Sequence, residues 1–217
     1  MPDDPTKPAP EVPLDGRRRE AARNDRRILD AARAVLLEDP GAPVAAVAKR
    51  AGVGISALYR RYPGKDALLR ALARDGLERF AAALEDGLAD ERDPWTAYTA
   101  TLAAVVEGGS QALAQRLAGT FEPDDDLDRL AARADRLWVA LDARVREAGA
   151  LREDVTAADV VLLLEVVMLV DVPDAARVEE LRQRYLALLL HGLKAPAAGP
   201  LPGAPADGAD LAARWRR

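Results

Sequence analysis

Apolar residues recur with the period of an α-helix along most of this chain, and no segment shows the sustained alternation expected of a β-strand. Clusters of Pro, Gly and Asp, such as residues 39–41 and 93–94, separate the periodic segments and are typical of helix boundaries. With 217 residues, the chain is long enough for one large domain or two small ones with a buried core. These features predict an all-α fold of about nine helices.

Changes in composition predict four segments along the chain. Residues 1–16 combine Pro and Asp without periodicity, so we expect a disordered leader. Three helices are expected over residues 17–64, and a larger set of helices over residues 65–194. Residues 195–217 are rich in Pro, Gly and Ala, which predicts a flexible tail.

The composition excludes several classes of protein. Because there is no cysteine and only one histidine, His191, we expect no disulfide, no metal site and no cofactor. The longest apolar run, residues 160–170, is interrupted by Glu165 and is too short to span a bilayer. The acidic, proline-broken start does not resemble a signal peptide. We therefore expect a cytoplasmic protein that does not act at a membrane.

Charge is unevenly distributed along the chain. The formal net charge is −5, yet residues 15–65 hold 12 Lys and Arg against 6 Asp and Glu, which leaves 19 basic and 30 acidic residues elsewhere. A basic segment joined to an acidic remainder indicates a module that binds a polyanion, carried on a body that does not. Chance patterning on solvated helices is the alternative.

Two short helices are expected within the basic segment, one on each side of Gly52. A helix-turn-helix requires a small residue where the helices cross, a residue that accepts positive φ in the turn, and apolar side chains in the wedge. Ala48 and Gly52 meet the first two requirements, and Val47, Val53 and Leu58 meet the third. The second helix would then be exposed to a DNA major groove. A tight helical hairpin without DNA binding is the alternative.

The string around these helices is specific. It reads ILDAA at residues 28–32, VAKRAGV at 47–53 and LYRRYPGK at 58–65, followed by ALL at 67–69. Over about residues 23–70 the chain closely resembles the TetR family of bacterial transcriptional regulators. Two later patterns, DPWTAY and LREDVT, resemble an actinobacterial branch of that family. The resemblance implies an N-terminal three-helix helix-turn-helix domain and a C-terminal helical domain for ligand binding and dimerisation.

The resemblance implies roles for individual residues. Tyr59 matches a tyrosine whose hydroxyl binds a DNA phosphate, and Lys65 matches a lysine that meets a phosphate at a helix N-terminus. Arg60 and Arg61 are expected to contact guanine or phosphate. The positions nearest the base edges are Gly54, Ile55, Ser56 and Ala57.

The basic segment also departs from the family pattern. Val44 and Ala45 occupy the DNA-contacting positions at the start of the first short helix, where the family often has threonine and a polar base-reading residue. Arg61 replaces a commoner histidine. The arginines at residues 17–19 and Arg23 either reach the adjacent minor groove and phosphates or form a solvated charge run.

A homodimer through the last two helices is also implied. Residues 160–170 are apolar nearly all round, as in a helix buried on two sides. Val178, Leu181, Tyr185 and Leu188 share one face of the last helix, which would complete a four-helix seam with a second subunit. Burial within a thick monomeric core is the alternative.

A small-molecule effector is expected to bind between helices of the C-terminal domain. Glu165 is unusual there, because a carboxylate in an apolar helix is costly unless it is paired. It is expected either to contact the effector or to pair with an arginine. The other candidate pocket residues are Trp95, Tyr98, Phe121, Trp138 and Met168, and residues of these types more often belong to a plain hydrophobic core.

These observations predict a dimeric repressor that binds a palindromic operator in double-stranded DNA and is released by a small-molecule effector. A constitutive regulator without an effector is one alternative. An all-α enzyme is another, although the chain has no Glu-x-x-His repeat, Gly-rich phosphate loop or nucleophile elbow. A protein-binding scaffold is the third, and it does not explain the spacing of Tyr59 and Lys65.

Overall fold

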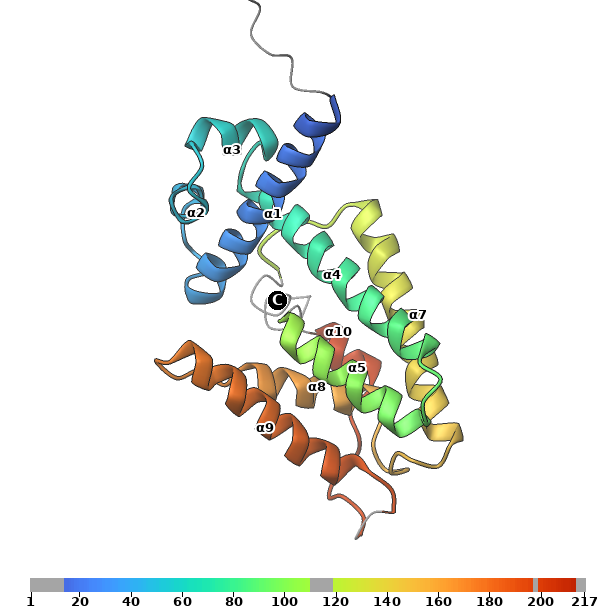
Figure 1. The fold of residues 1–217 in the computed structure, drawn as a ribbon. Coiled ribbons are helices and arrows are strands. Elements are labelled where there is room, and N and C mark those ends of the chain that lie inside the picture. The colour runs from blue at the N-terminus through green and yellow to red at the C-terminus, as the bar shows by residue number, and fades with distance from the viewer. Residues whose placement is uncertain (1–13, 110–118, 197–198, 214–217) are drawn as a thin grey trace, which may run out of the picture.

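The computed structural model describes residues 14–109, 119–196 and 199–213. Within these ranges the chain forms nine helices and no strand, and a single isolated bridge pairs Leu151 with Lys194. The predicted all-α fold is confirmed (Figure 1). The helices are α1 (Leu14–Glu38), α2 (Val44–Ala51), α3 (Ile55–Arg61), α4 (Lys65–Ala89), α5 (Pro94–Gly108), α7 (Asp125–Glu147), α8 (Ala157–Met168), α9 (Ala175–Leu193) and α10 (Gly208–Ala213).

Helices α1, α2 and α3 close around a first hydrophobic core together with the start of α4. Leu58 of α3 is fully buried there, and Tyr62 closes the core just after that helix. Figure 1 shows these helices as a separate group from which α4 leads away. The central members of this core are Ile28, Ala32, Leu36, Val47, Ala48, Leu58, Leu68, Leu69 and Leu72.

A second hydrophobic core lies among the end of α4 and helices α5, α7, α8 and α9. The helix α4 packs against α5 and α7, and α8 packs against α9. Apolar side chains from all five helices meet in this core, because each helix carries a stripe at helical spacing. Its most buried members are Leu84, Tyr98, Leu102, Val106, Leu141, Val145, Val160 and Leu164.

The two cores share α4, which contributes Leu72 to the first and Leu84 to the second. Ion pairs reinforce the junction beside the first core. The Arg33 guanidinium of α1, mostly buried, lies 2.6 Å from the Asp75 carboxylate of α4, and Arg79 lies 3.1 Å from the same carboxylate. Since α4 is continuous, a tilt of its second half moves the first half as well.

Helix boundaries follow local capping chemistry. The Asp93 carboxylate accepts the Thr96 backbone N–H at 3.1 Å ahead of Pro94 at the first helical position of α5, as the sequence predicts. Thr156 and Asp159 form the predicted capping box at the start of α8. At the end of α4, Arg144 of α7 donates to backbone carbonyls of that helix and of the following loop, including the Asp90 carbonyl at 2.6 Å.

Several boundaries differ from those that the sequence predicts. Helix α1 begins at Leu14, earlier than the expected residue 17. The short helix expected after Gly109 lies outside the described residues. Helix α10, which the sequence analysis did not predict, brings the described helices to nine. Arginines occupy residues 17–19, and arginine has good helix propensity, so the helix that begins at Leu14 continues through them.

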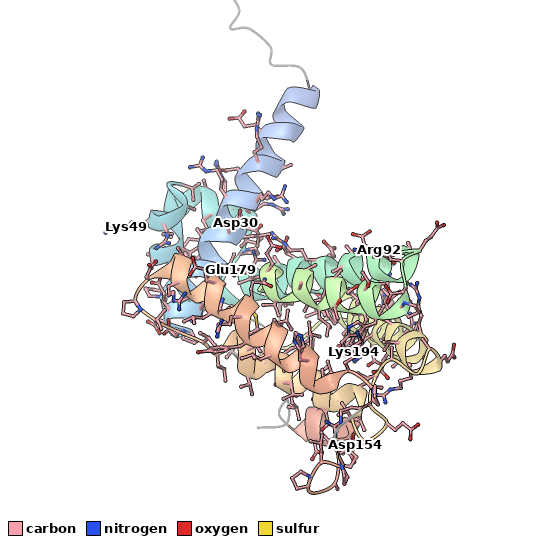
Figure 2. The ribbon with its side chains drawn as sticks, turned by 60° about the horizontal axis from the view of Figure 1, so that its bottom comes forward. Asp30, Lys49, Arg92, Asp154, Glu179 and Lys194 are labelled. Atoms are coloured by element: carbon pink, nitrogen blue, oxygen red, sulfur yellow. The ribbon has the colours of Figure 1, made fainter. Side chains whose placement is uncertain are left out.

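Residues 199–213, for which the composition predicts a flexible tail, make hydrogen bonds with the residues around the start of α8. The Thr156 hydroxyl donates to the Ala206 carbonyl at 2.7 Å, and the Asp159 carboxylate accepts the Ala206 N–H at 2.9 Å. The Arg152 guanidinium donates to the Gly199 carbonyl at 2.8 Å. These polar contacts hold a segment that buries little apolar surface. Figure 2 shows Asp154 beside α10, away from Lys49 on α2.

No helix within residues 14–109, 119–196 and 199–213 is both long enough and apolar enough to cross a bilayer.

Replacement of Gly87 by alanine is expected to destabilise the protein, because Gly87 is buried where α4 crosses α5 and an added Cβ would overlap the hydroxyl of buried Thr101. We expect a loss of about 1–3 kcal/mol in the free energy of unfolding, measured by urea denaturation. Gly192→Ala is the control, since its Cβ would meet no atom within 4 Å. Equal stability of the two variants would show that this crossing is not tightly packed.

Candidate nucleic-acid interface

The turn between α2 and α3 depends on the backbone of Gly52. This residue has φ 65° and ψ 34°, a left-handed conformation that costs a residue with a Cβ about 1–2 kcal/mol. Its neighbour Val53 donates its N–H to the Ala48 carbonyl at 3.0 Å. From α1, the Arg27 guanidinium donates to the Ala51 carbonyl at 2.9 Å. The end of α2 is therefore satisfied by hydrogen bonds, and the chain reverses into α3 without a longer loop.

One side of α2 and α3 is buried in the first core. Val47, Ala48 and Leu58 are between 0% and 3% exposed, as the helix-turn-helix spacing predicts. Val44 is buried as well, which differs from its expected place in a DNA contact. An apolar β-branched side chain at this position gains more from the core than from water. Ala45, the next residue, is exposed.

The opposite side of α3 faces solvent. Ile55 is 40% exposed and Tyr59 is 49% exposed, and both are among the few large apolar or aromatic side chains that the first domain leaves uncovered. Ser56 and Arg60 are exposed beside them, whereas Ala57 is half-buried. Gly54, just before the helix, is exposed and has no atom within 4 Å of the position of a Cβ. The face is thus open for a second molecule.

Arg61 is held by an acidic residue of α1. Its Nε lies 2.7 and 2.9 Å from the two carboxylate oxygens of Asp25, and its guanidinium lies 5.3 Å from the centre of the Tyr62 ring. The hydrogen bond to Asp25 raises the pKa of Arg61, and burial raises the pKa of the Tyr62 hydroxyl. Arg61 is therefore occupied within the protein, unlike Arg60.

Lys65 is also engaged by the protein. Its Nζ donates to the Pro40 carbonyl at 3.1 Å and ties the turn after α1 to the start of α4. The ammonium group has three donors, so this bond leaves two of them for another acceptor. The sequence does not reveal the Arg61–Asp25 ion pair or the Lys65–Pro40 hydrogen bond, because the two residues of each pair lie far apart along the chain.

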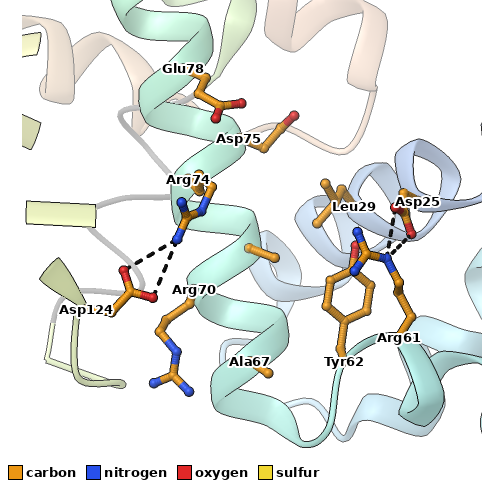
Figure 3. Close-up of a pocket in the computed structure, with 11 residues that line it drawn as sticks. Asp25, Leu29, Arg61, Tyr62, Ala67, Arg70, Arg74, Asp75, Glu78 and Asp124 are labelled. Carbon is orange, nitrogen blue, oxygen red and sulfur yellow. Dashed lines mark hydrogen bonds and ion pairs between the residues drawn. The ribbon is translucent and has the colours of Figure 1, made fainter. Parts of the chain in front are cut away.

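An open groove of about 430 Å³ lies between α1, the end of α3 and the first half of α4 (Figure 3). This groove lies at the junction of the two domains, whereas the sequence predicts an effector pocket within the C-terminal domain. Charges of both signs line it and pair with each other, as Arg61 does with Asp25 and Arg74 with Asp124 at 3.4 Å. The remaining lining residues are Leu29, Tyr62, Ala67, Arg70, Ala71, Asp75 and Glu78.

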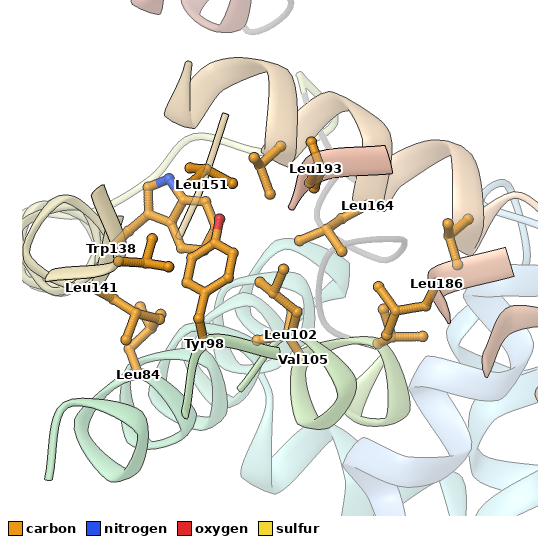
Figure 4. Packing of buried hydrophobic residues seen from close by; sticks show 14 of the residues in the cluster. Leu84, Tyr98, Leu102, Val105, Trp138, Leu141, Leu151, Leu164, Leu186 and Leu193 are labelled. Atoms are coloured by element: carbon orange, nitrogen blue, oxygen red, sulfur yellow. The ribbon is translucent and has the colours of Figure 1, made fainter. Parts of the chain in front are cut away.

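Four of the predicted pocket residues meet in the second core. Tyr98 is fully buried, and Trp138 and Met168 are 5% and 3% exposed. The centre of the Tyr98 ring lies 6.2 Å from the centre of the Trp138 ring, which is next to it in Figure 4. It also lies 6.2 Å from the centre of the ring of half-buried Trp95. Burial, with the negative charge of Asp142, raises the pKa of the Tyr98 hydroxyl, which is therefore neutral.

The other two predicted pocket residues are placed differently. Glu165 of α8 is buried, at 6% exposed, next to Leu164 of the second core. Phe121 packs against the first core instead, because the segment before α7 passes beside the start of α4. Among the residues that the structure describes, no group of three or more His, Cys, Asp or Glu side chains is arranged to hold a metal ion.

An apolar surface runs along α8 and α9. Val166 and Leu169 are 64% and 61% exposed, and Leu188 of α9 is 61% exposed. Tyr185 is 41% exposed, whereas Leu186 beside it is buried in the second core. We call Val166, Leu169, Tyr185 and Leu188 the α8–α9 apolar face.

Comparison with known protein families identifies both domains. Residues 28–72 match the family model described as bacterial regulatory proteins, tetR family. Residues 92–195 match the model described as the C-terminal domain of SbtR-like transcriptional regulators. The first match covers the helix-turn-helix and the start of α4, and the second covers α5 to α9.

One curated relative matches part of the chain. It is the HTH-type transcriptional repressor LfrR of Mycolicibacterium smegmatis, 48% identical over 63 residues. This match covers 29% of the present chain and 33% of the length of the relative. The similarity thus concerns about a third of that protein.

Solved structures match over most of the chain. The TetR regulator SCO0520 of Streptomyces coelicolor is 29% identical, with a TM-score of 0.56 over 80% of this chain and 99% of the other. LfrR of Mycobacterium smegmatis in complex with proflavine is 25% identical, with a TM-score of 0.58 over 80% and 95%. A regulator from Mycobacterium vanbaalenii is 29% identical, with a TM-score of 0.53 over 82% and 98%. The chain belongs to the TetR family of transcriptional regulators, which bind DNA and are not enzymes.

Proposed function

We propose that this protein is a repressor that binds a palindromic operator as a homodimer and leaves it when a small molecule binds the C-terminal domain. The observation that carries the proposal is the exposed face of α3 on a tightly packed helix-turn-helix. Ile55, Ser56, Tyr59 and Arg60 project from this face and have the chemistry for a major groove. The name of the relative LfrR, a repressor, supports repression over activation.

Each exposed side chain of α3 has a distinct task in the proposed complex. The Tyr59 hydroxyl donates to a phosphate, and Arg60 contacts either guanine or a phosphate. Ile55 contacts a thymine methyl group, while Gly54 and Ser56 allow the backbone to come close to the bases. Ala45 lies near the DNA backbone at the start of α2. Lys65 contacts a phosphate with the donors that its bond to Pro40 leaves free.

The α8–α9 apolar face supports a homodimer. Exposed side chains of this size on two adjacent helices are costly in water and stable when a second copy covers them. Val178 and Leu181 are half-buried on the same helix as Tyr185 and Leu188, so all four extend the predicted seam. Two copies joined here would present two α3 helices, as a palindromic operator requires.

Effector release is supported by a relative rather than by a bound molecule. The LfrR structure is a complex with proflavine, a small molecule, and it shares the fold over 80% of this chain. In the present protein Tyr98, Trp138 and Met168 are buried, with half-buried Trp95 packed against their cluster, in the domain that would receive such a molecule. Glu165 is buried in the same domain. The second candidate function is a constitutive regulator with no effector.

Selection from a pool of random duplexes is expected to recover an inverted repeat, and binding to it is expected to weaken steeply as salt rises. Arg60→Ala is expected to reduce affinity by about fivefold to 150-fold, corresponding to about 1–3 kcal/mol, and to relax sequence preference if the contact is to a base. Arg129→Ala on α7 is the control for loss of one positive charge. Binding that is weak and indifferent to sequence would contradict the proposed operator recognition.

Asp25→Asn is expected to raise DNA affinity by up to about fivefold, because it releases Arg61 for a phosphate, and an exposed ion pair is worth about 0.2–1 kcal/mol. The slope of log affinity against log salt should steepen by about one. Asp30→Asn on the same helix is the matched control, since Asp30 pairs with Arg33 and Arg79 instead. Loss of affinity in Asp25→Asn would mean that the carboxylate positions Arg61 for DNA.

Leu188→Glu is expected to convert the dimer into monomers, because it places a charge in the centre of the α8–α9 apolar face. Sedimentation velocity measures the change, and operator affinity should fall with it. Val139→Glu is the control, since Val139 is 55% exposed on α7, outside that face. A Leu188→Glu protein that remains dimeric would place the interface elsewhere.

A further inference from the structure

Two polar atoms in the second core have no hydrogen-bond partner. The Tyr98 hydroxyl and the Trp138 indole N–H are both inaccessible to solvent and unbonded within the described chain. The two residues are 0% and 5% exposed. Buried donors of this kind are rare in folded proteins, because a donor that gives up water without a replacement destabilises the fold. Their presence indicates that something else accepts from them.

The two atoms belong to one aromatic cluster. Phe80, Trp138, Tyr98 and Trp95 follow one another with ring centres 6.4, 6.2 and 6.2 Å apart. The chain has only nine Phe, Trp and Tyr residues, so four of them converge at this place. In Figure 4, Tyr98 and Trp138 lie side by side with Leu141 and Leu151 next to them. The two donors are therefore surrounded by aromatic rings and apolar side chains.

The chemistry of the donors limits what can bind. An indole N–H donates and never accepts, and the neutral Tyr98 hydroxyl is able to donate beside it. Asp142, the acid whose charge acts on the Tyr98 hydroxyl, is already held by Arg146, with its oxygens 2.6 and 3.2 Å from the guanidinium. Aromatic side chains favour a planar ring system stacked against them. The matching ligand is planar and apolar and carries an oxygen or nitrogen that accepts hydrogen bonds.

We propose that Tyr98 and Trp138 form the recognition pair of the effector site, and that the effector is a neutral planar aromatic compound whose carbonyl oxygen accepts from both. This inference rests on the proposed effector response and gives it a ligand class. Tyr98 belongs to α5 and Trp138 to α7, and both helices pack on α4. A molecule that enters between them displaces the end of α4, which continues into the first core. The two α3 helices of the dimer would then change their separation.

The test uses a matched pair of probes and the full-length protein. Fluorenone is planar and carries one carbonyl, and fluorene has the same rings without it. We expect fluorenone to bind the wild-type protein at least tenfold more tightly than fluorene, by calorimetry, and to weaken operator binding. Equal affinity for the two probes, or binding of neither, would overturn the proposal while leaving DNA recognition intact.

Two variants test whether Tyr98 and Trp138 cause the preference for fluorenone over fluorene. Tyr98→Phe and Trp138→Phe each remove one donor and keep an aromatic ring, so each should lower the preference for fluorenone by about tenfold. Both should retain operator binding and should unfold at the wild-type temperature or above it, because each removes an unpaired buried group. Tyr62→Phe, in the first core, is the control and should leave the preference unchanged.

A buried water is the competing acceptor for the two donors. If water alone bonds them, both variants will unfold at a lower temperature and will bind the two probes with unchanged ratio. That outcome would assign the pair to structure and overturn the proposed recognition role.

Discussion

Continuity of α4 through two hydrophobic cores is the constraint on which the rest of the structure depends. Leu72 packs with the helix-turn-helix and Leu84 packs with the C-terminal helices, so neither core forms without this helix. The Arg33–Asp75 ion pair fixes α1 to α4 beside the first core, and Arg144 satisfies the carbonyls at the other end. One continuous helix therefore joins the two cores.

The exposed surface of α3, which we propose meets DNA, depends as much on ion pairs and hydrogen bonds within the protein as on the residues that it displays. Three cations, Arg60, Arg61 and Lys65, were expected to contact DNA at or near α3, yet Arg61 is paired with Asp25 and Lys65 donates to Pro40. Arg27 instead completes the end of α2. Arg60 and Tyr59 are consequently the side chains best placed to meet a phosphate or a base at no cost to the fold. The engagement of Arg61 and Lys65 within the protein therefore limits how strongly the first domain can bind a polyanion.

The second core combines close packing with unsatisfied polar groups. Gly87 lets α4 and α5 approach until Thr101 fills the space, while the donors of Tyr98 and Trp138 stay unbonded a short distance away. A core designed only for stability would use phenylalanine at Tyr98, since the hydroxyl gains nothing there. The α8–α9 apolar face likewise does not suit the stability of a monomer. Its exposed apolar side chains suit association with a second copy.

Local chemistry in the sequence determined the helical fold, the helix-turn-helix and most helix starts. The Gly52 turn, the Asp93 cap and the Thr156 capping box each depend on residues within a few positions of one another, so the sequence displays them directly.

Tertiary structure alone decided which expected site residues are available and where they meet. Val44 turned into the first core, Phe121 joined that same core, and residues 199–213 were held at the start of α8. Arg61 met Asp25 from a different helix. Apart from the burial of Val44, these outcomes depend on partners more than 30 residues away. No local pattern encodes such a partner, because helix packing brings the pair together.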